Sequence, residues 1–183
     1  VGNNGIVVRG NAPKFLQWRM EDVEIPNPNH FAEVTTFGGG GLSALSSFVL
    51  GNSDFMTGAF PAEYSNALSG VLDMNLRTGN NQKRENTVQL GLVGIDIASE
   101  GPFKKGSNSS YIFNYRYSTL GLLSSMLPED AENTKYQDLS FKLNFPTKST
   151  GVFSIWGVGL IDRSGQKAET DPSKWEYMQD KED

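Results

Sequence analysis

Residues 57–80 read TGAFPAEYSNALSGVLDMNLRTGN, and the character of the chain changes across them. The stretch opens with a Gly-Ala-Phe-Pro turn, continues through small residues and becomes an extended run over residues 71–78, which Gly79 and Asn80 end. Before it, short patterned segments alternate with loops, whereas after it apolar residues follow a period of two. We therefore expect one structural unit to end and another to begin near residue 81.

The upstream unit is expected to combine strands with one short helix, which makes the predicted fold class α+β. Residues 15–25 alternate roughly between apolar and polar, so we expect a strand that turns near Glu21 and Asp22. Apolar residues recur at helical spacing over residues 42–49, which predicts a short helix. Residues 26–41 hold two prolines and four consecutive glycines, which indicates a long irregular loop.

The downstream unit is expected to form antiparallel hairpins, because its apolar residues alternate with polar ones. Residues 111–117 place four aromatic rings on one face, and residues 139–145 repeat the pattern with two leucines and two phenylalanines. A change of phase around Gly91 and Gly94 indicates a tight hairpin or a bulge. These patterns predict about five strands in all.

The alternation has two interpretations, and the strands alone leave both open. A soluble antiparallel sheet would place its aromatic face on a core and its polar face in water. A membrane barrel would place the aromatic face towards lipid and the polar face towards the lumen. Soluble sheets are commoner, whereas the short turns at residues 104–109 and 147–150 and the longer loop at residues 124–137 match the connections of such barrels.

Composition and charge exclude several classes of function. The 183 residues carry a formal net charge of -5, which argues against a nucleic-acid surface because non-specific binding depends on phosphate neutralisation by Lys and Arg. The chain has no cysteine, so disulfides and thiolate metal sites are excluded. No run of about 18 apolar residues is present, which excludes a transmembrane helix but leaves open transmembrane strands of about 9 to 11 residues.

The end of the opening stretch resembles the last part of the plug of TonB-dependent outer-membrane receptors, where the chain leaves the plug and enters the barrel. The resemblance rests on a proline, an acidic residue and a tyrosine within residues 61–64, on Leu-Ser-Gly-Val at residues 68–71, and on the alternating strand that follows. The segments at residues 9–11 and 54–58 resemble earlier parts of the same plug. The motifs occur in the family's order and cover most of the chain.

This resemblance implies a domain organisation and a function. Residues 1–81 would be the C-terminal portion of a small mixed-sheet plug, and residues 82–183 the first antiparallel hairpins of an incomplete transmembrane β-barrel. A plugged transporter has about 22 strands, so this chain would leave its sheet edges open, with its strands paired between copies or poorly ordered. The complete protein would lie in the outer membrane and take up a scarce nutrient, with the plug gating the lumen.

The partners implied by the resemblance are the TonB complex of the inner membrane, outer-membrane lipid and a small nutrient ligand, with a surface lipoprotein as a further partner it allows. It implies no cofactor. In this family the loop after the second plug strand faces the outer surface and touches substrate. The substrate-binding candidates are therefore Asn11, Lys14, Asn27, Asn29, His30 and Phe31. The alternative interpretation of these residues is a solvated surface loop.

Two further side chains bear on the function. His30 is the only histidine, and one histidine without cysteine cannot supply a structural zinc site. Arg9 resembles the plug arginines that bond barrel glutamates in this family, and its partners would lie beyond Asp183; a partly exposed arginine is the alternative. No carboxylate pair is spaced for acid and base chemistry, so catalysis is not expected. The competing hypothesis for the whole chain is a soluble β-rich module that binds a ligand or a glycan on its aromatic rings.

Overall fold

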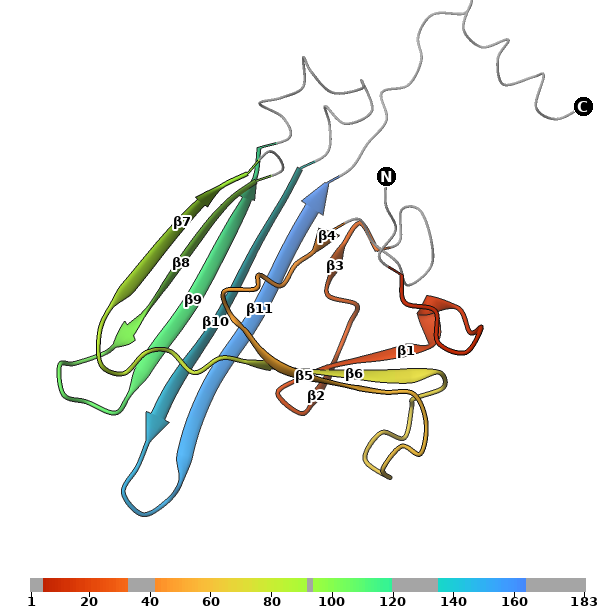
Figure 1. The fold of residues 1–183 in the computed structure, drawn as a ribbon, viewed down its shortest axis with the longest axis horizontal. Helices are drawn as coiled ribbons and strands as arrows, with labels where there is room; N and C mark the ends of the chain where they lie inside the picture. The colour runs from red at the N-terminus through yellow and green to blue at the C-terminus, as the bar shows by residue number, and fades with distance from the viewer. Residues whose placement is uncertain (1–4, 33–41, 92–93, 120–134, 164–183) are drawn as a thin grey trace, which may run out of the picture.

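Strands dominate the computed structural model, which describes residues 5–32, 42–91, 94–119 and 135–163 (Figure 1). Within these ranges the only helical element is the 3-10 turn η1 (Pro13–Phe15), and no helix is long and apolar enough to cross a membrane. The predicted α+β class is therefore wrong, because the part of the chain seen here is β-rich throughout.

The helix predicted over residues 42–49 is replaced by a short strand and a turn. The Ser43 hydroxyl accepts a hydrogen bond from the Leu45 amide at 3.2 Å, and the Ser46 hydroxyl accepts one from the Phe48 amide at 3.3 Å. Serine side chains that bond nearby backbone groups compete with the helical hydrogen-bond ladder. Leu45 and Val49 are nevertheless buried, so the apolar spacing correctly indicated burial but not a helix.

The upstream unit forms a mixed four-stranded sheet in the order β2-β1-β6-β5. Its strands are β1 (Leu16–Met20), β2 (Val23–Ile25), β5 (Leu50–Met56) and β6 (Gly70–Leu76). Strands β1 and β6 are parallel, and the two outer pairs are antiparallel. The predicted turn at Glu21 and Asp22 is confirmed, and both residues adopt left-handed backbone, with φ of 50° and 66°.

The downstream unit forms a five-stranded antiparallel sheet in the order β11-β10-β9-β8-β7, as the hairpin prediction required. Its strands are β7 (Glu85–Leu90), β8 (Gly94–Pro102), β9 (Ser110–Ser118), β10 (Lys135–Pro146) and β11 (Val152–Arg163). Within the described ranges, β7 and β11 each pair on one side only, so both edges are open. Of the loop predicted over residues 124–137, residues 124–134 lie outside the described ranges, and residues 135–137 begin β10.

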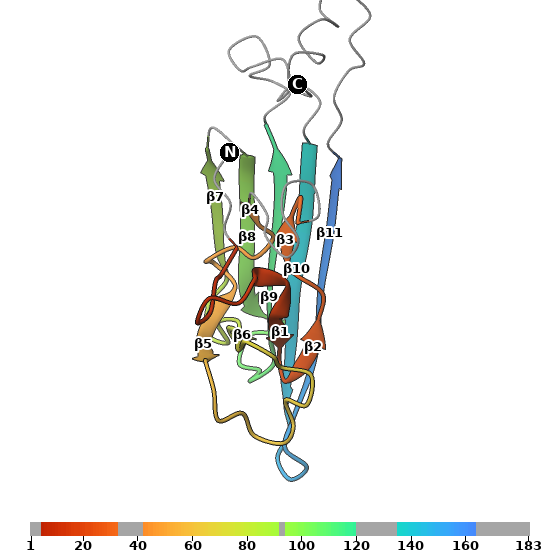
Figure 2. The same cartoon turned by 90° about the vertical axis from the view of Figure 1, so that its right-hand side faces the viewer.

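The four-stranded sheet lies against one face of the five-stranded sheet (Figures 1 and 2). A third, two-stranded sheet, β3 (Asn29–His30) with β4 (Leu42–Ser43), lies beside β10 and β11 on the same face. We call this face, which carries Ser110, Ile112, Asn114, Arg116 and Ser118 of β9, the inner face. The rings at residues 111–117 lie on the opposite, outer face.

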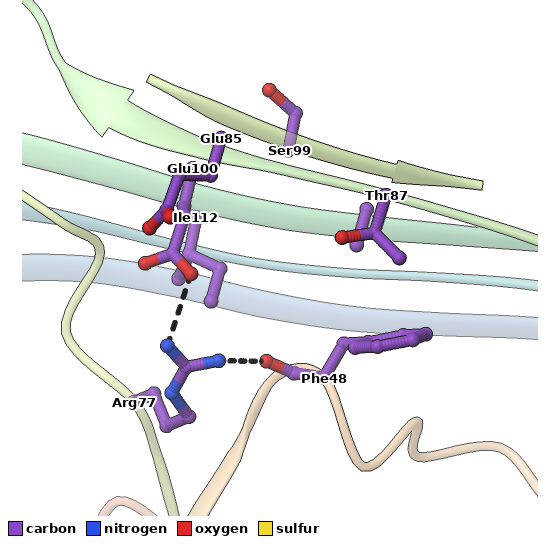
Figure 3. Close-up of a pocket in the computed structure, with 8 residues that line it drawn as sticks. Phe48, Arg77, Glu85, Thr87, Ser99, Glu100 and Ile112 are labelled. Atoms are coloured by element: carbon purple, nitrogen blue, oxygen red, sulfur yellow. Dashed lines mark hydrogen bonds and ion pairs between the residues drawn. The ribbon is translucent and has the colours of Figure 1, made fainter. Parts of the chain in front are cut away.

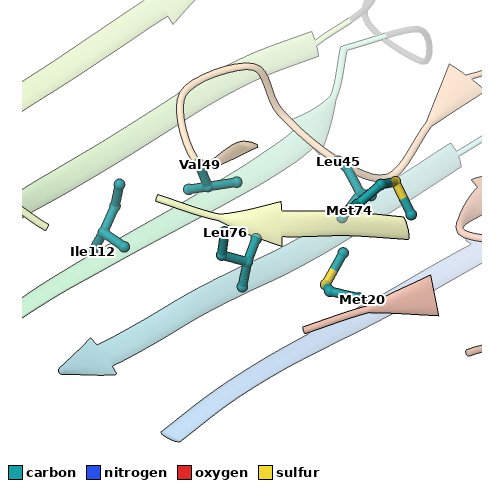
Figure 4. Packing of buried hydrophobic residues seen from close by; sticks show 6 residues of the cluster. All are labelled: Met20, Leu45, Val49, Met74, Leu76 and Ile112. Carbon is teal, nitrogen blue, oxygen red and sulfur yellow. The ribbon is translucent and has the colours of Figure 1, made fainter. Parts of the chain in front are cut away.

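A small apolar core joins the two units (Figure 4). Its buried members are Met20, Leu45, Val49, Met74, Leu76 and Ile112. Five of them come from the upstream unit and only Ile112 from the five-stranded sheet, which explains why that sheet can keep a mostly polar inner face. Half-buried Trp156 and Val158 of β11 extend the apolar contact towards the edge of the sheet.

The connection between the units passes close to β9 at Gly79. A methyl group at Gly79 would lie 2.0 Å from the Tyr111 carbonyl oxygen, whereas one at Gly159 of β11 would have no neighbour within 4 Å. We expect Gly79→Ala to lower the free energy of unfolding by about 1–3 kcal/mol, because the backbone must shift to admit the methyl group. Urea unfolding followed by tryptophan fluorescence measures this, and Gly159→Ala is the matched control. Equal midpoints for the two variants would contradict this close approach.

Candidate functional site

The polar contacts between the upstream unit and the inner face form the most distinctive constellation in the described chain. Buried polar residues line this face on adjacent strands: Asn114 on β9, and Asp138, Ser140, Lys142 and Asn144 on β10. Buried polar groups cost free energy unless they are hydrogen-bonded, so their partners define what the interface does. Three groups of contacts supply those partners.

His30 is the centre of the first group. Its ring is completely buried, with Nε2 2.9 Å from an Asp138 oxygen and Nδ1 3.4 Å from an Asp162 oxygen. The Phe31 amide also donates to Asp162, at 3.1 Å. Arg116 binds both Asp138 oxygens, with its Nε at 3.0 and 3.2 Å and its Nη2 at 2.8 Å. His30 of β3 thus contacts carboxylates of β10 and β11, and Asp138 links it to Arg116 of β9.

A short turn presents His30 to the five-stranded sheet. The Asn27 side-chain oxygen accepts hydrogen bonds from the Asn29 amide at 3.1 Å and from the Asn29 side chain at 2.6 Å. Asparagine favours such local turns because its side chain can bond the backbone two residues on. Pairing of His30 with Leu42 then holds β3 on β4, and Arg116 fixes β4 by donating to the Ser43 carbonyl.

The second group is centred on Lys142. Its ammonium nitrogen donates to both Glu21 carboxylate oxygens, at 2.7 and 2.8 Å, and to the Leu76 carbonyl at 3.1 Å. Glu21 in turn accepts a hydrogen bond from the Leu76 amide at 2.7 Å. A single lysine of β10 therefore binds the β1–β2 turn and the end of β6 together.

The third group lies where the upstream unit ends (Figure 3). Arg77 donates to Glu100 of β8 at 3.0 Å and to the Phe48 carbonyl at 2.6 Å. The other Glu100 oxygen accepts the Asn80 amide at 2.7 Å. Close by on the same face, the Ser46 hydroxyl donates to Asp96 of β8 at 2.9 Å. These contacts fix the connection between the two units to the inner face.

The contacts of these three groups join the upstream unit to the inner face of the five-stranded sheet. Both ring nitrogens of His30 lie within 3.4 Å of carboxylate oxygens, and its ring packs against Tyr136 with 4.8 Å between the ring centres. Among the described residues, no group of three or more His, Cys, Asp and Glu side chains could hold a metal ion. What the arrangement can do is hold two sheets together through charged hydrogen bonds, which are stronger than neutral ones.

The structure separates the predicted substrate-binding residues. His30 and Asn29 are buried, and Asn27 and Phe31 are half-buried beside them. The alternative interpretation of His30 as a solvated surface-loop residue is therefore wrong, because its ring lies between Asp138 and Asp162. Asn11 and Lys14 are exposed on another segment, before and within η1, where Lys14 lies over the Phe15 ring. A role of these residues in substrate binding stays a prediction.

Arg9 lies against Gly58 within the upstream unit, with left-handed backbone at φ 51°. No carboxylate in the described ranges pairs with it, so its proposed contact with barrel glutamates stays a prediction. Within the described ranges, Arg77 does form an ion pair across the interface, with Glu100. Sequence reasoning did not assign Arg77, Lys142 or Asp138 to a site, although the charges at inner-face positions of alternating strands were a usable signal.

Removal of Lys142 tests the second group of contacts. Lys142→Met should cost about 3–5 kcal/mol of docking stability, because it leaves the Glu21 carboxylate in the interface without its cation. Hydrogen–deuterium exchange should show faster exchange of the Leu76 amide. Lys83→Met is the matched control, since Lys83 pairs with Glu85 at 2.8 Å on the exposed surface and its loss should change little. Unchanged protection of Leu76 in Lys142→Met would contradict this role.

Comparison of the chain with protein families, with curated proteins and with solved structures gives no match. Any function must therefore be argued from the geometry of the two sheets and their contacts.

Proposed function

We propose that this chain is part of a TonB-dependent outer-membrane receptor for energised nutrient uptake, in which the upstream unit is the plug and the five-stranded sheet begins the surrounding wall. Its outer face would contact lipid, and its inner face would line the lumen that the plug closes. A nutrient ligand outside and the TonB complex of the inner membrane would be its partners.

The observation that carries this proposal is the distribution of polarity between the two faces. On the outer face Val88, Leu90 and Ile161 are 65%, 76% and 65% exposed, and the rings of β9 and β10 lie between them. No described element covers this face (Figure 1). The covered inner face carries the charges instead. This is the inverse of a soluble sheet, and it is the polarity of a strand wall in lipid.

The alternative of a soluble β-rich binding module requires the rings to lie in a core or to stack on a ligand. A continuous exposed apolar surface across five strands exceeds what soluble monomers usually tolerate. The rings also contact one another: Phe103 stacks on Phe145 at 5.2 Å with a 12° angle between their planes. Rings stacked on each other leave less of their faces for a sugar, so the geometry favours lipid as the occupant.

The inner interface is suited to a plug that must move. Ser110, Asn114 and Ser140 each bury a side-chain oxygen that has no hydrogen-bond partner among the described residues. Such oxygens gain hydrogen bonds when water reaches them, so part of the free energy of separating the sheets is recovered. A mostly polar interface can thus close the lumen and still be opened by an applied force.

A lysine on the outer face would test the lipid contact. Phe113 lies in the middle of β9 and pairs with Phe141 of β10. In the complete protein, Phe113→Lys should reduce insertion into phospholipid vesicles by about 2–4 kcal/mol, because a cation is most costly near the bilayer midplane. Phe153→Lys, near the end of β11, is the control and should cost less. Insertion that is equally unaffected by both substitutions, or a protein that stays in the aqueous phase, would contradict the proposal.

Removal of the upstream unit tests the gating function. Deletion of residues 5–77 from the complete protein should leave an open wall, so cells that produce it should admit a large hydrophilic antibiotic that cells with the intact protein exclude. Growth inhibition measures the entry. Surface labelling of both proteins serves as the control for their amount in the membrane. Unchanged permeability with the shortened protein correctly inserted would refute a plugging role.

A further inference from the structure

Four exposed cations gather at one end of the five-stranded sheet. Arg84 directly precedes β7, Lys104 and Lys105 lie in the β8–β9 turn, and Lys148 lies in the β10–β11 turn. All three segments are at the same end of the strands (Figure 1). We call these four residues the basic rim.

The basic rim lacks acidic partners in the part of the chain that the structure describes. None of its four side chains forms an ion pair there, whereas the neighbouring cations Lys83 and Arg77 pair with Glu85 and Glu100. The two turns, FKKGSNS at residues 103–109 and TKSTG at residues 147–151, contain no acidic residue. This local excess of positive charge contrasts with the net charge of the whole chain, which is -5.

Aromatic rings accompany these cations on the outer face. Phe103 lies 5.7 Å from the Tyr111 ring and stacks on Phe145, and the Arg84 guanidinium lies 6.0 Å from the centre of Tyr111. Rings grouped next to cations at the end of an apolar face are typical of the boundary between hydrocarbon and headgroups. At such a boundary, rings contact the hydrocarbon and cations reach the headgroups and the water beyond them.

We propose that the basic rim binds the headgroups of anionic phospholipids in the leaflet at the short-turn end of the wall. This inference rests on the proposed function, because only a sheet in the bilayer brings the turns to headgroup level. Its charge complements headgroup phosphates, and the four cations, spread over three connections, fit a lipid surface better than one compact anion. Each such cation strengthens association with an anionic membrane on the order of fivefold.

The test uses the complete protein in vesicles of phosphatidylcholine that contain phosphatidylglycerol, and it measures the relative association of spin-labelled forms of the two lipids. Wild-type protein should prefer phosphatidylglycerol, and added salt should weaken that preference. The triple variant Lys104→Gln/Lys105→Gln/Lys148→Gln should associate almost equally with phosphatidylglycerol and phosphatidylcholine. Lys83→Gln should keep the preference, since Lys83 is already paired with Glu85.

The outcomes separate this inference from the proposed function. Protection from protease shows whether the protein inserts into the vesicles. A wild-type protein that fails to insert overturns both the proposed function and this inference. An inserted protein without lipid preference overturns only the lipid-binding role of the basic rim. If the glutamine variant does not insert, Lys104→Arg/Lys105→Arg/Lys148→Arg must keep the preference, and loss of it refutes the inference. Inorganic phosphate that abolishes the preference at constant ionic strength would identify a free-phosphate site and overturn the assignment to lipid.

Discussion

The contact between Lys142 and Glu21 is the interaction on which the arrangement of the two sheets depends. Glu21 occupies a tight turn with left-handed backbone, a conformation that costs a non-glycine residue about 1–2 kcal/mol. Its amide bonds the Met74 carbonyl at 2.9 Å, while its carboxylate binds Lys142 and the Leu76 amide. The strained residue is thus the one that joins β1, β6 and β10, and these contacts offset its strain.

Charged contacts of this kind also explain why the five-stranded sheet is polar on the face where the four-stranded sheet lies against it. Its inner face contributes Ile112, Trp156 and Val158 to the apolar core, and elsewhere the contact is made by charges and amides. Separating an apolar contact would expose apolar surface to water. The charged groups of this interface can instead replace their hydrogen bonds to one another with hydrogen bonds to water. The outer face has the opposite composition and carries rings and aliphatic side chains. The opposite polarity of the two faces is the support for the proposal that the sheet separates lipid from a closed lumen.

Much of the architecture follows from local patterns. The period of two after residue 84 predicted the antiparallel hairpins and the aromatic face of β9 and β10. The rough alternation of residues 15–25 predicted the strand and its turn at Glu21 and Asp22. The pattern over residues 42–49 identified buried residues correctly, but the helix predicted from it is wrong. Serine hydroxyls bond the backbone there, and a turn replaces the helix. Apolar spacing reports which side chains are buried, and local hydrogen bonds decide the backbone that buries them.

His30 marks the limit of what the sequence determined. The sequence by itself determined which residues alternate along the strands after residue 84 and which side chains share a face of the sheet. Only the tertiary structure brought His30 against Asp138 and Asp162, which follow it by 108 and 132 positions. Local periodicity carries no information about partners so distant along the chain, because their meeting depends on how the two sheets dock.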